Sequence, residues 1–205
     1  MIEERHVAMK KVVHQLKTTF NFPLEEAHAL ELFAREGDWQ TIVYASHVKS
    51  LEVWEINPEY YDGLRRNLPD AEIKITDTWK EIKRTQKKYD LIVVDTPQAT
   101  YGENNEHCEH FGLLPDIFRI TNDGGVIILN VNIVPYGLNE QPLWRERREE
   151  YYKTHRPEKV AFDDVIRHYK RIFKENNVSM RWYLFQQRHT KFIYYFVMQM
   201  QRLNK

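Results

Sequence analysis

Four short apolar runs of the sequence each end in, or beside, an acidic side chain. The runs are HALELFA, LEVWEI, AEIKI and YDLIVVD; the first leads into the acidic loop FAREGDW, and the acids at the other three ends are Glu55, Asp77 and Asp95. A carboxylate can accept hydrogen bonds from both hydroxyls of a ribose. In nucleotide-binding folds this acidic residue typically lies about 20 positions after the ligand-binding loop. Glu55 follows Gly37 of the FAREGDW loop by 18 residues. One such acid is more often a helix cap, but the set favours a nucleoside site.

A second group of polar side chains follows the fourth and fifth apolar runs. The loop QATYGENNEHCEHFG (98–112) carries Tyr101, His107 and His110, and the run GGVIILNV carries Asn130, with Asn132 after it. Long polar loops on a rigid scaffold often carry function. The catalytic candidates are Asp95, Tyr101 and His110. Asp95 with one of the histidines and Asn132 could instead bind a divalent ion, but ligands without fixed spacing are a weak signal, and we predict no metal site.

The elements that must position these side chains alternate along the chain. Strand candidates at 28–34, 51–56, 71–75, 89–95 and 124–131 are short and apolar, with segments of helical length between them. Asn57, Pro58 and Glu59 read as an N-cap, a first-turn proline and a favourable acid, which predicts a helix directly after 51–56. The alternation predicts an α/β fold with a doubly wound, mostly parallel seven-stranded sheet and helices on both faces.

The two ends of the chain depart from this alternation. Apolar residues recur at helical spacing from Met9 to Phe20, which predicts an N-terminal helix within 1–22 that NFP ends. Segment 138–178 is basic and predicted to be helical, with one apolar face over 162–173. Only three residues separate the apolar runs 180–187 and 191–200, which predicts a terminal antiparallel hairpin.

Composition limits the class of protein. A chain of 205 residues with 42% hydrophobic content can bury one large core, and we predict a single domain over 1–205. The longest apolar runs are far shorter than the ~20 residues that cross a bilayer, and the charged N-terminus lacks an apolar leader, so we expect no membrane span and a cytoplasmic location. The single cysteine, Cys108, excludes an intramolecular disulfide.

Charge is unevenly distributed although the net charge is zero. Residues 1–137 hold 15 Lys and Arg against 22 Asp and Glu, whereas residues 138–205 hold 15 against 8. The basic side chains cluster at Arg145, Arg147, Arg148, Lys153, Arg156 and Lys159. Such asymmetry can mark a surface for a polyanion, but a solvated or docked face is the simpler interpretation. We therefore favour a small molecule or peptide over nucleic acid as partner, and leave the oligomeric state open.

These motifs resemble the class I S-adenosylmethionine-dependent methyltransferase family. The similarity covers roughly Ala27 to Val134, through ELFAREG, LEVWEINPEYYDGLRRNL, KITDTW and YDLIVVDTP, and the terminal hairpin is similar to the family's closing strands. The family's first loop reads acid-x-G-x-G-x-G or acid-x-F-A-G-x-G, and Glu31 to Gly37 match it here. The resemblance implies S-adenosylmethionine as cofactor and methyl transfer to a nitrogen or oxygen nucleophile.

The resemblance also implies a role for each matched position. Glu31 would help to hold the methionine end of the cofactor, and the Phe33 to Gly37 backbone would pass beneath it. Glu55 would bind the ribose, Asp77 would meet the adenine amino group, and Asp95 would face the transferring methyl. The implied cofactor-binding residues are Glu31, Phe33, Arg35, Gly37, Glu55, Ile56, Asp77, Thr78, Trp79 and Asp95.

Two departures from the family pattern leave alternatives open. Arg35 stands where the loop favours glycine, so it either obstructs the cofactor or pairs with its carboxylate, and the second interpretation is favoured. Thr96 and Gln98 replace the first proline and the aromatic of an Asp-Pro-Pro-Tyr sequence, which disfavours a flipped base as acceptor. The alternatives are a non-catalytic nucleoside-binding or scaffold subunit, an aminopropyltransferase, and an NAD-type oxidoreductase, whose G-x-G-x-x-G fingerprint is absent.

Overall fold

The order of the elements follows the hydrophobic pattern of the sequence. In the computed structural model, which describes residues 2–203, strands and helices alternate from β1 (His28–Leu32) to β7 (Thr121–Asn132). Between them lie α2 (Thr41–Tyr44), β2 (Ser50–Glu55), α3 (Tyr61–Asn67), β3 (Glu72–Ile75), α4 (Thr78–Arg84), β4 (Tyr89–Val94) and α5 (Leu114–Ile120). Met1, Asn204 and Lys205, at the ends of the predicted range 1–205, lie outside the described residues.

Local chemistry sets several element ends. The Asn57 side chain accepts a hydrogen bond from the Glu59 backbone N–H at 3.0 Å, and a 3₁₀ turn at Pro58–Tyr60 then leads into α3. The N-terminal helix α1 (Ile2–Thr18) ends just before NFP, as predicted. Strand β1 ends at Leu32, two residues before the end of the predicted run 28–34, because the backbone turns left-handed at Phe33 with φ 65°.

The sheet has the predicted doubly wound topology. Its strand order is β3-β2-β1-β4-β7-β9-β8, in which only β9 (Ile193–Arg202) runs opposite to the other strands and pairs with β8 (Val178–Gln187). The predicted α/β fold with a terminal antiparallel hairpin is confirmed. A second, two-stranded sheet forms within the 98–112 loop from β5 (Thr100–Tyr101) and β6 (His107–Cys108). These strands were not predicted, because two residues are too few to carry a periodicity.

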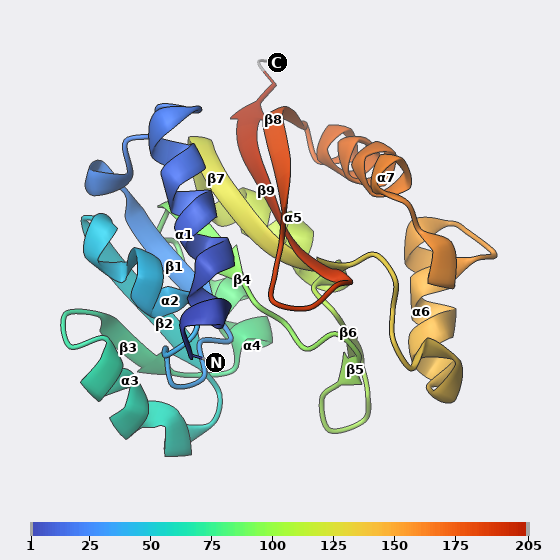
Figure 1. Ribbon diagram of the computed structural model, residues 1–205, viewed down its shortest axis with the longest axis horizontal. Helices are drawn as coiled ribbons and strands as arrows, with labels where there is room; N and C mark the ends of the chain where they lie inside the picture. The colour runs from blue at the N-terminus through green and yellow to red at the C-terminus, as the bar shows by residue number, and fades with distance from the viewer. Residues whose placement is uncertain (1, 204–205) are drawn as a thin grey trace.

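Successive side chains of the strands supply two separate cores, one on each face of the sheet. Val53, Val93 and Ile128 pack with helices α1, α2 and α3. Their neighbours Trp54, Val94 and Leu129 pack with α4, α5 and α7 (Phe162–Glu175) on the opposite face. Figure 1 shows α1 across one face, and α6 (Pro142–Tyr152) and α7 beyond the β8–β9 hairpin. Because the helices cover the two faces of the sheet, the ends of the strands are left for a ligand site.

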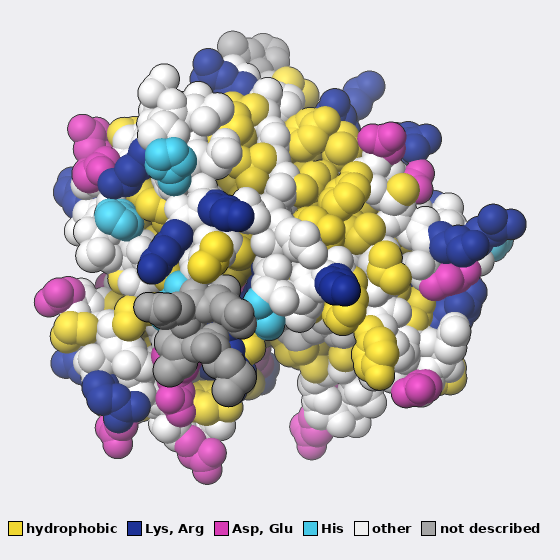
Figure 2. Space-filling view, viewed as in Figure 1, with side chains coloured by type: hydrophobic (Ala, Val, Ile, Leu, Met, Phe, Trp, Pro, Cys, Tyr) yellow, Lys and Arg dark blue, Asp and Glu magenta, His cyan; other side chains and the backbone are white. Residues whose placement is uncertain are grey.

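The surface is unevenly apolar. Figure 2 shows hydrophobic side chains gathered over the β8–β9 hairpin and α7, with charged side chains around the rest of the outline. Phe162 and Tyr183, each 37% exposed, belong to these elements. Among the helices within residues 2–203, none combines the length and the apolar character needed to cross a membrane.

Candidate functional site

A cavity of about 820 Å³ lies at the carboxyl ends of β1 to β4 and is also lined by the β5–β6 loop and the β8–β9 turn. The strand order reverses between β1 and β4, and open α/β sheets bind ligands at that point. The predicted site residues that line it are Phe33, Arg35, Glu55, Ile56, Asp77, Thr78, Trp79, Asp95 and Tyr101. Three predicted residues, Glu31, Gly37 and His110, do not line it.

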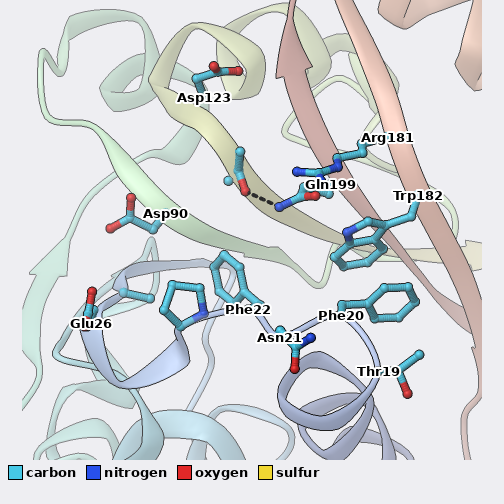
Figure 3. Close-up of a pocket in the computed structure, with 14 residues that line it drawn as sticks. Thr19, Phe20, Asn21, Phe22, Glu26, Asp90, Asp123, Arg181, Trp182 and Gln199 are labelled. Carbon is cyan, nitrogen blue, oxygen red and sulfur yellow. Dashed lines mark hydrogen bonds between the residues drawn. The ribbon is translucent and has the colours of Figure 1, made fainter.

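A second cavity, of about 630 Å³, lies at the opposite ends of the strands, near the starts of β1, β4 and β7. Figure 3 shows the stacked rings of Phe20 and Trp182 on one side of it, with centroids 3.7 Å apart. Two of its three carboxylates are already engaged: Asp90 accepts from the His28 backbone N–H at 2.9 Å and Asp123 from the Arg202 backbone N–H at 2.7 Å. None of the predicted site residues lines this cavity, so the carboxyl edge is the candidate site.

The loop after β1 keeps the backbone shape that alternating glycines would give. Phe33, Arg35 and Gly37 have φ of 65°, 52° and 71°, which is the left-handed region. These are the three positions at which the resembling motif carries glycine, and side chains at two of them cost strain of order 1–2 kcal/mol each. The Arg35 backbone N–H donates to Glu55 at 2.8 Å, which ties this loop to the end of β2.

Gly37 is required by packing. A Cβ atom at this position would lie 2.5 Å from Cδ1 of Leu68 and 3.3 Å from Cδ2 of Leu64, both of which are buried. Gly37 therefore allows the loop to sit against α3. The structure gives it no part in the wall of the cavity.

Glu31 lies beneath the cavity. Its side chain is fully buried, accepts a hydrogen bond from Nε2 of Gln40 at 2.8 Å, and is bonded to the hydroxyl of Tyr44. Burial raises the pKa of the Glu31 carboxyl to about 8, so the group is mostly uncharged near neutral pH. An uncharged carboxyl that already has two partners is a poor ligand for an ammonium group, and the cavity geometry does not favour the role expected from the resemblance.

Asp95 is held in an ion pair that sequence reasoning missed. Its two carboxylate oxygens accept from the guanidinium of Arg188, and Oδ1 also accepts from Nδ2 of Asn130 at 2.8 Å. The Arg188 and Asp95 side chains are only 5% and 15% exposed. Because Arg188 comes from the β8–β9 turn, the only sequence signal was an arginine between two predicted strands. The paired carboxylate can orient a neighbouring group.

The end of the cavity next to β2 and β3 carries an exposed apolar side chain and the N-cap residue of α4. Ile56 lines the cavity and is 63% exposed, although it is a large hydrophobic residue. Asp77 caps α4 by accepting from the Trp79 backbone N–H at 2.9 Å, and it pairs with Lys80 at 3.1 Å. Partial burial would raise the pKa of the Asp77 carboxyl, but the bonds from Lys80 and from the backbone outweigh it and lower that pKa. Asp77 is therefore an ionised acceptor.

The two other catalytic candidates differ in position. Tyr101 lines the cavity, but its hydroxyl donates to the backbone carbonyl of Glu109 at 2.7 Å, and burial raises the pKa of the phenol. His110 is fully buried away from the cavity against the hydroxyl of Tyr169 in α7, and burial lowers the pKa of its imidazole to about 3. We do not retain His110 as a catalytic candidate, because the fold packs its loop under α7.

Trp79 and His107 stack in parallel at 3.8 Å and form one wall of the cavity. Over residues 2–203, no cluster of three His, Cys, Asp or Glu side chains is placed to hold a metal ion. His110, one of the two histidines considered for such a site, is engaged with Tyr169. The alternative of a divalent ion at Asp95 gains no support from the structure.

The basic segment is partly neutralised by the fold. The buried guanidinium of Arg148 donates to Glu109 Oε1 at 2.6 Å and to the backbone carbonyl of Asn132 at 2.8 Å. Arg145 pairs with Glu149 at 3.2 Å and Glu158 at 3.1 Å. The six basic residues therefore do not form one free cationic face, which agrees with the simpler interpretation of the charge asymmetry.

Comparison with known proteins points to one group of folds. The chain is similar to a proposed methyltransferase complexed with S-adenosylhomocysteine (SAH), with a TM-score of 0.63 and 12% identity over 94% of this chain, and it spans 49% of that longer protein. It is similar to a proposed RNA methyltransferase from Pyrococcus horikoshii, with a TM-score of 0.60 and 14% identity over 97% of this chain and 85% of that one.

A third similar structure is magnesium protoporphyrin IX methyltransferase from Synechocystis PCC 6803 with bound SAM, with a TM-score of 0.58 and 11% identity over 98% of this chain and 82% of that one. No model of a known protein family matches the sequence, and no curated protein matches it. The likeness therefore lies in the three-dimensional structure, and at such identities it concerns the fold.

Proposed function

Since the chain has the class I methyltransferase fold, we propose that it is an S-adenosylmethionine-dependent methyltransferase that acts on a nitrogen or oxygen nucleophile of a small molecule or peptide. One observation carries the proposal. The cavity at the strand-order reversal is lined by most of the residues that the family resemblance assigned to the cofactor, and these come from four separate strand ends. Similar proteins that were solved with SAH or SAM bound support the same cofactor here.

The residues at the β2 and β3 ends fit an adenosine group. The Glu55 carboxylate accepts from the backbone N–H groups of Arg35 at 2.8 Å and Asn57 at 2.9 Å, one on each oxygen. Each oxygen keeps acceptor capacity for a ribose hydroxyl. Ile56 offers an exposed apolar face to a planar ring, and Asp77 offers an ionised acceptor to an amino group. A volume of about 820 Å³ lies within the range of small-ligand cavities.

The residues at the β1 and β4 ends fit the amino-acid part of the cofactor. The Arg35 guanidinium carbon lies 5.3 Å from the ring centroid of Trp39 and 5.8 Å from that of Tyr60, and no described carboxylate lies within 4 Å of its nitrogens. We assign it to the cofactor carboxylate. S-adenosylmethionine supplies an activated sulfonium methyl, so the protein needs mainly to orient the acceptor and exclude water.

One observation favours a second candidate function. Asp95 is neutralised by Arg188, so the segment in which the family places catalytic side chains offers no free base. Thr96 and Gln98 also depart from the family pattern there. A non-catalytic subunit that binds the cofactor without turnover would keep the adenosine contacts and tolerate this change.

Isothermal titration calorimetry with SAH tests the proposal. Glu55→Ala should weaken SAH binding by about 1.5–3 kcal/mol, because charged hydrogen bonds to a buried ligand are lost. Glu59→Ala is the matched control, since Glu59 is an exposed acid four residues away that does not line the cavity. The proposal is wrong if the wild type binds no SAH, or if it binds NAD in place of SAH. Equal affinities of Glu55→Ala and wild type would remove the adenosine assignment.

A further inference from the structure

Three arginines and a histidine surround Trp39 beside the cavity. The guanidinium carbons of Arg5, Arg35 and Arg188 lie 4.7, 5.3 and 6.0 Å from the centroid of the Trp39 ring. The His189 ring meets the same indole edge to face at 5.8 Å. These residues come from α1, the loop after β1 and the β8–β9 turn, so only the tertiary fold brings them together.

This cluster carries an excess of positive charge. Arg188 is paired with Asp95, but no described acidic side chain lies within 4 Å of the guanidinium nitrogens of Arg5 or Arg35. Glu31, which also acts on Arg188, is mostly uncharged near neutral pH because burial raises its pKa to about 8. If Arg35 binds the cofactor carboxylate, Arg5 remains as a cation with no counterion among the described side chains.

A buried side-chain nitrogen at this end has no partner among the described residues. The Arg188 side chain is 5% exposed and lines the cavity, and its Nε atom makes no hydrogen bond to any described residue. An N–H donor in that position costs free energy unless a ligand or water accepts from it. The guanidinium binds Asp95 through Nη1 and Nη2, so Nε is the nitrogen of this side chain that makes no hydrogen bond to a described residue.

Trp39, Arg188 and His189 line one end of the cavity, and Arg5 contacts the Trp39 ring without lining the cavity itself. Along the sheet edge, Ile56 and Asp77 follow β2 and β3, whereas Asp95 and the β8–β9 turn lie on the opposite side of β1. Through Arg188 the Trp39 cluster adjoins Asp95, and through the backbone N–H of Arg35 it is joined to Glu55 at the adenosine contacts. One cavity of about 820 Å³ must hold both cofactor and acceptor, which favours a small acceptor.

We propose that the Trp39 end of the cavity is an acceptor subsite for a small anionic molecule, whose carboxylate or phosphate group binds Arg5 and the Nε–H of Arg188 beside the Trp39 ring. The proposal rests on the proposed function, because it names the substrate class of that same site. Planar, two-pronged donors suit carboxylate and phosphate equally, and an aromatic ring beside them suits an acceptor with an unsaturated or ring portion.

The test uses benzoate and phenyl phosphate as probes in calorimetry, with benzyl alcohol as the uncharged control, both without SAH and with SAH at saturation. Wild type should bind at least one of the two anions and should not bind benzyl alcohol. Arg5→Gln should weaken anion binding at least about tenfold while leaving SAH affinity within about twofold. Arg5→Lys should recover part of the loss, because it restores the charge without the planar fork.

Lys11→Gln is the matched control, because it removes one positive charge from an exposed position of the same helix and Lys11 lines neither cavity. It should leave anion binding unchanged, and a loss equal to that of Arg5→Gln would reduce the effect to net charge and overturn the subsite. SAH binding without anion binding in the wild type would overturn the subsite alone and leave the methyltransferase proposal standing.

Absence of SAH binding would overturn the proposed function, and the titrations without SAH would then still decide whether the anion site exists. A short single-stranded RNA that binds in an Arg5-dependent way, when neither small anion binds, would overturn the small-acceptor class. The substitutions should fold, since Arg5 is an exposed residue near the start of α1. Thermal unfolding of each variant checks this directly.

Discussion

The substitution Glu31→Gln separates a structural role of Glu31 from a role in holding the cofactor. The carboxyl is fully buried under the cavity, with Nε2 of Gln40 at 2.8 Å and the Tyr44 hydroxyl as its partners. A glutamine has nearly the same shape. Its amide oxygen can accept from Gln40, and its amide NH₂ can donate to the Tyr44 oxygen, so no buried polar group is left without a partner.

The expected effect depends on pH, with a sign fixed by the direction of the pKa shift. The pKa of Glu31 is raised from 4.5 to about 8, first by burial, with a smaller contribution from the charge of Asp95. The folded state therefore keeps a proton that the unfolded state releases. The stabilisation is fully present below pH 4.5 and is lost as the pH rises toward 8.

The magnitude follows from the size of the shift. Each unit of pKa difference corresponds to about 1.36 kcal/mol, so between pH 5 and pH 8 wild type should lose roughly 3 kcal/mol of unfolding free energy through Glu31. Glutamine does not titrate. The stability of Glu31→Gln relative to wild type should therefore improve by roughly 3 kcal/mol over that interval, on top of the changes that both proteins share.

Urea unfolding of both proteins at pH 5, 6, 7 and 8 measures this difference, and SAH calorimetry on the same samples tests the site. Glu146→Gln is the control, because it makes the same chemical change at an exposed glutamate of α6 that does not line the cavity. A stability difference between Glu31→Gln and wild type that stays constant across this range would refute the argument that Glu31 is buried as the neutral acid. A large loss of SAH affinity would instead return Glu31 to the cofactor site.

The remaining predictions concern the loop after β1 and the ion pair between Asp95 and Arg188. Gly37→Ala should lower the free energy of unfolding by about 1–3 kcal/mol more than Gly137→Ala in urea melts, because both glycines have φ 71° but only the first Cβ would collide with a buried side chain. Asp95→Asn should lower the free energy of unfolding by about 3–5 kcal/mol, because it leaves the buried guanidinium of Arg188 unpaired. Adding Arg188→Met should restore most of that free energy, whereas additive losses from the two substitutions would exclude the coupling. In SAH calorimetry, Arg35→Gly and Arg35→Lys should both weaken binding, lysine less so, whereas tighter binding by Arg35→Gly would identify the arginine as an obstruction.

The sequence by itself determined the fold and the residues that follow the strands at the candidate site. Apolar runs of strand length and the Asn57 cap are local signals, because they depend on residues that are neighbours along the chain. Parallel strands place their carboxyl ends at one edge, so the positions of Glu55, Asp77 and Asp95 followed once the strands were assigned. The short β5–β6 pair was beyond such reasoning, since it has no periodicity to detect.

Only the tertiary structure decided which charges meet. Arg188 reaches Asp95 across 93 residues because the terminal hairpin returns the chain to the carboxyl edge, and Arg5 reaches Trp39 because α1 packs across the same face as α2 and α3. The same packing buried Glu31 in an uncharged form and moved His110 away from the cavity. Charge state and partnership depend on burial and on segments far apart in sequence, and both are fixed by how the sheet and helices pack.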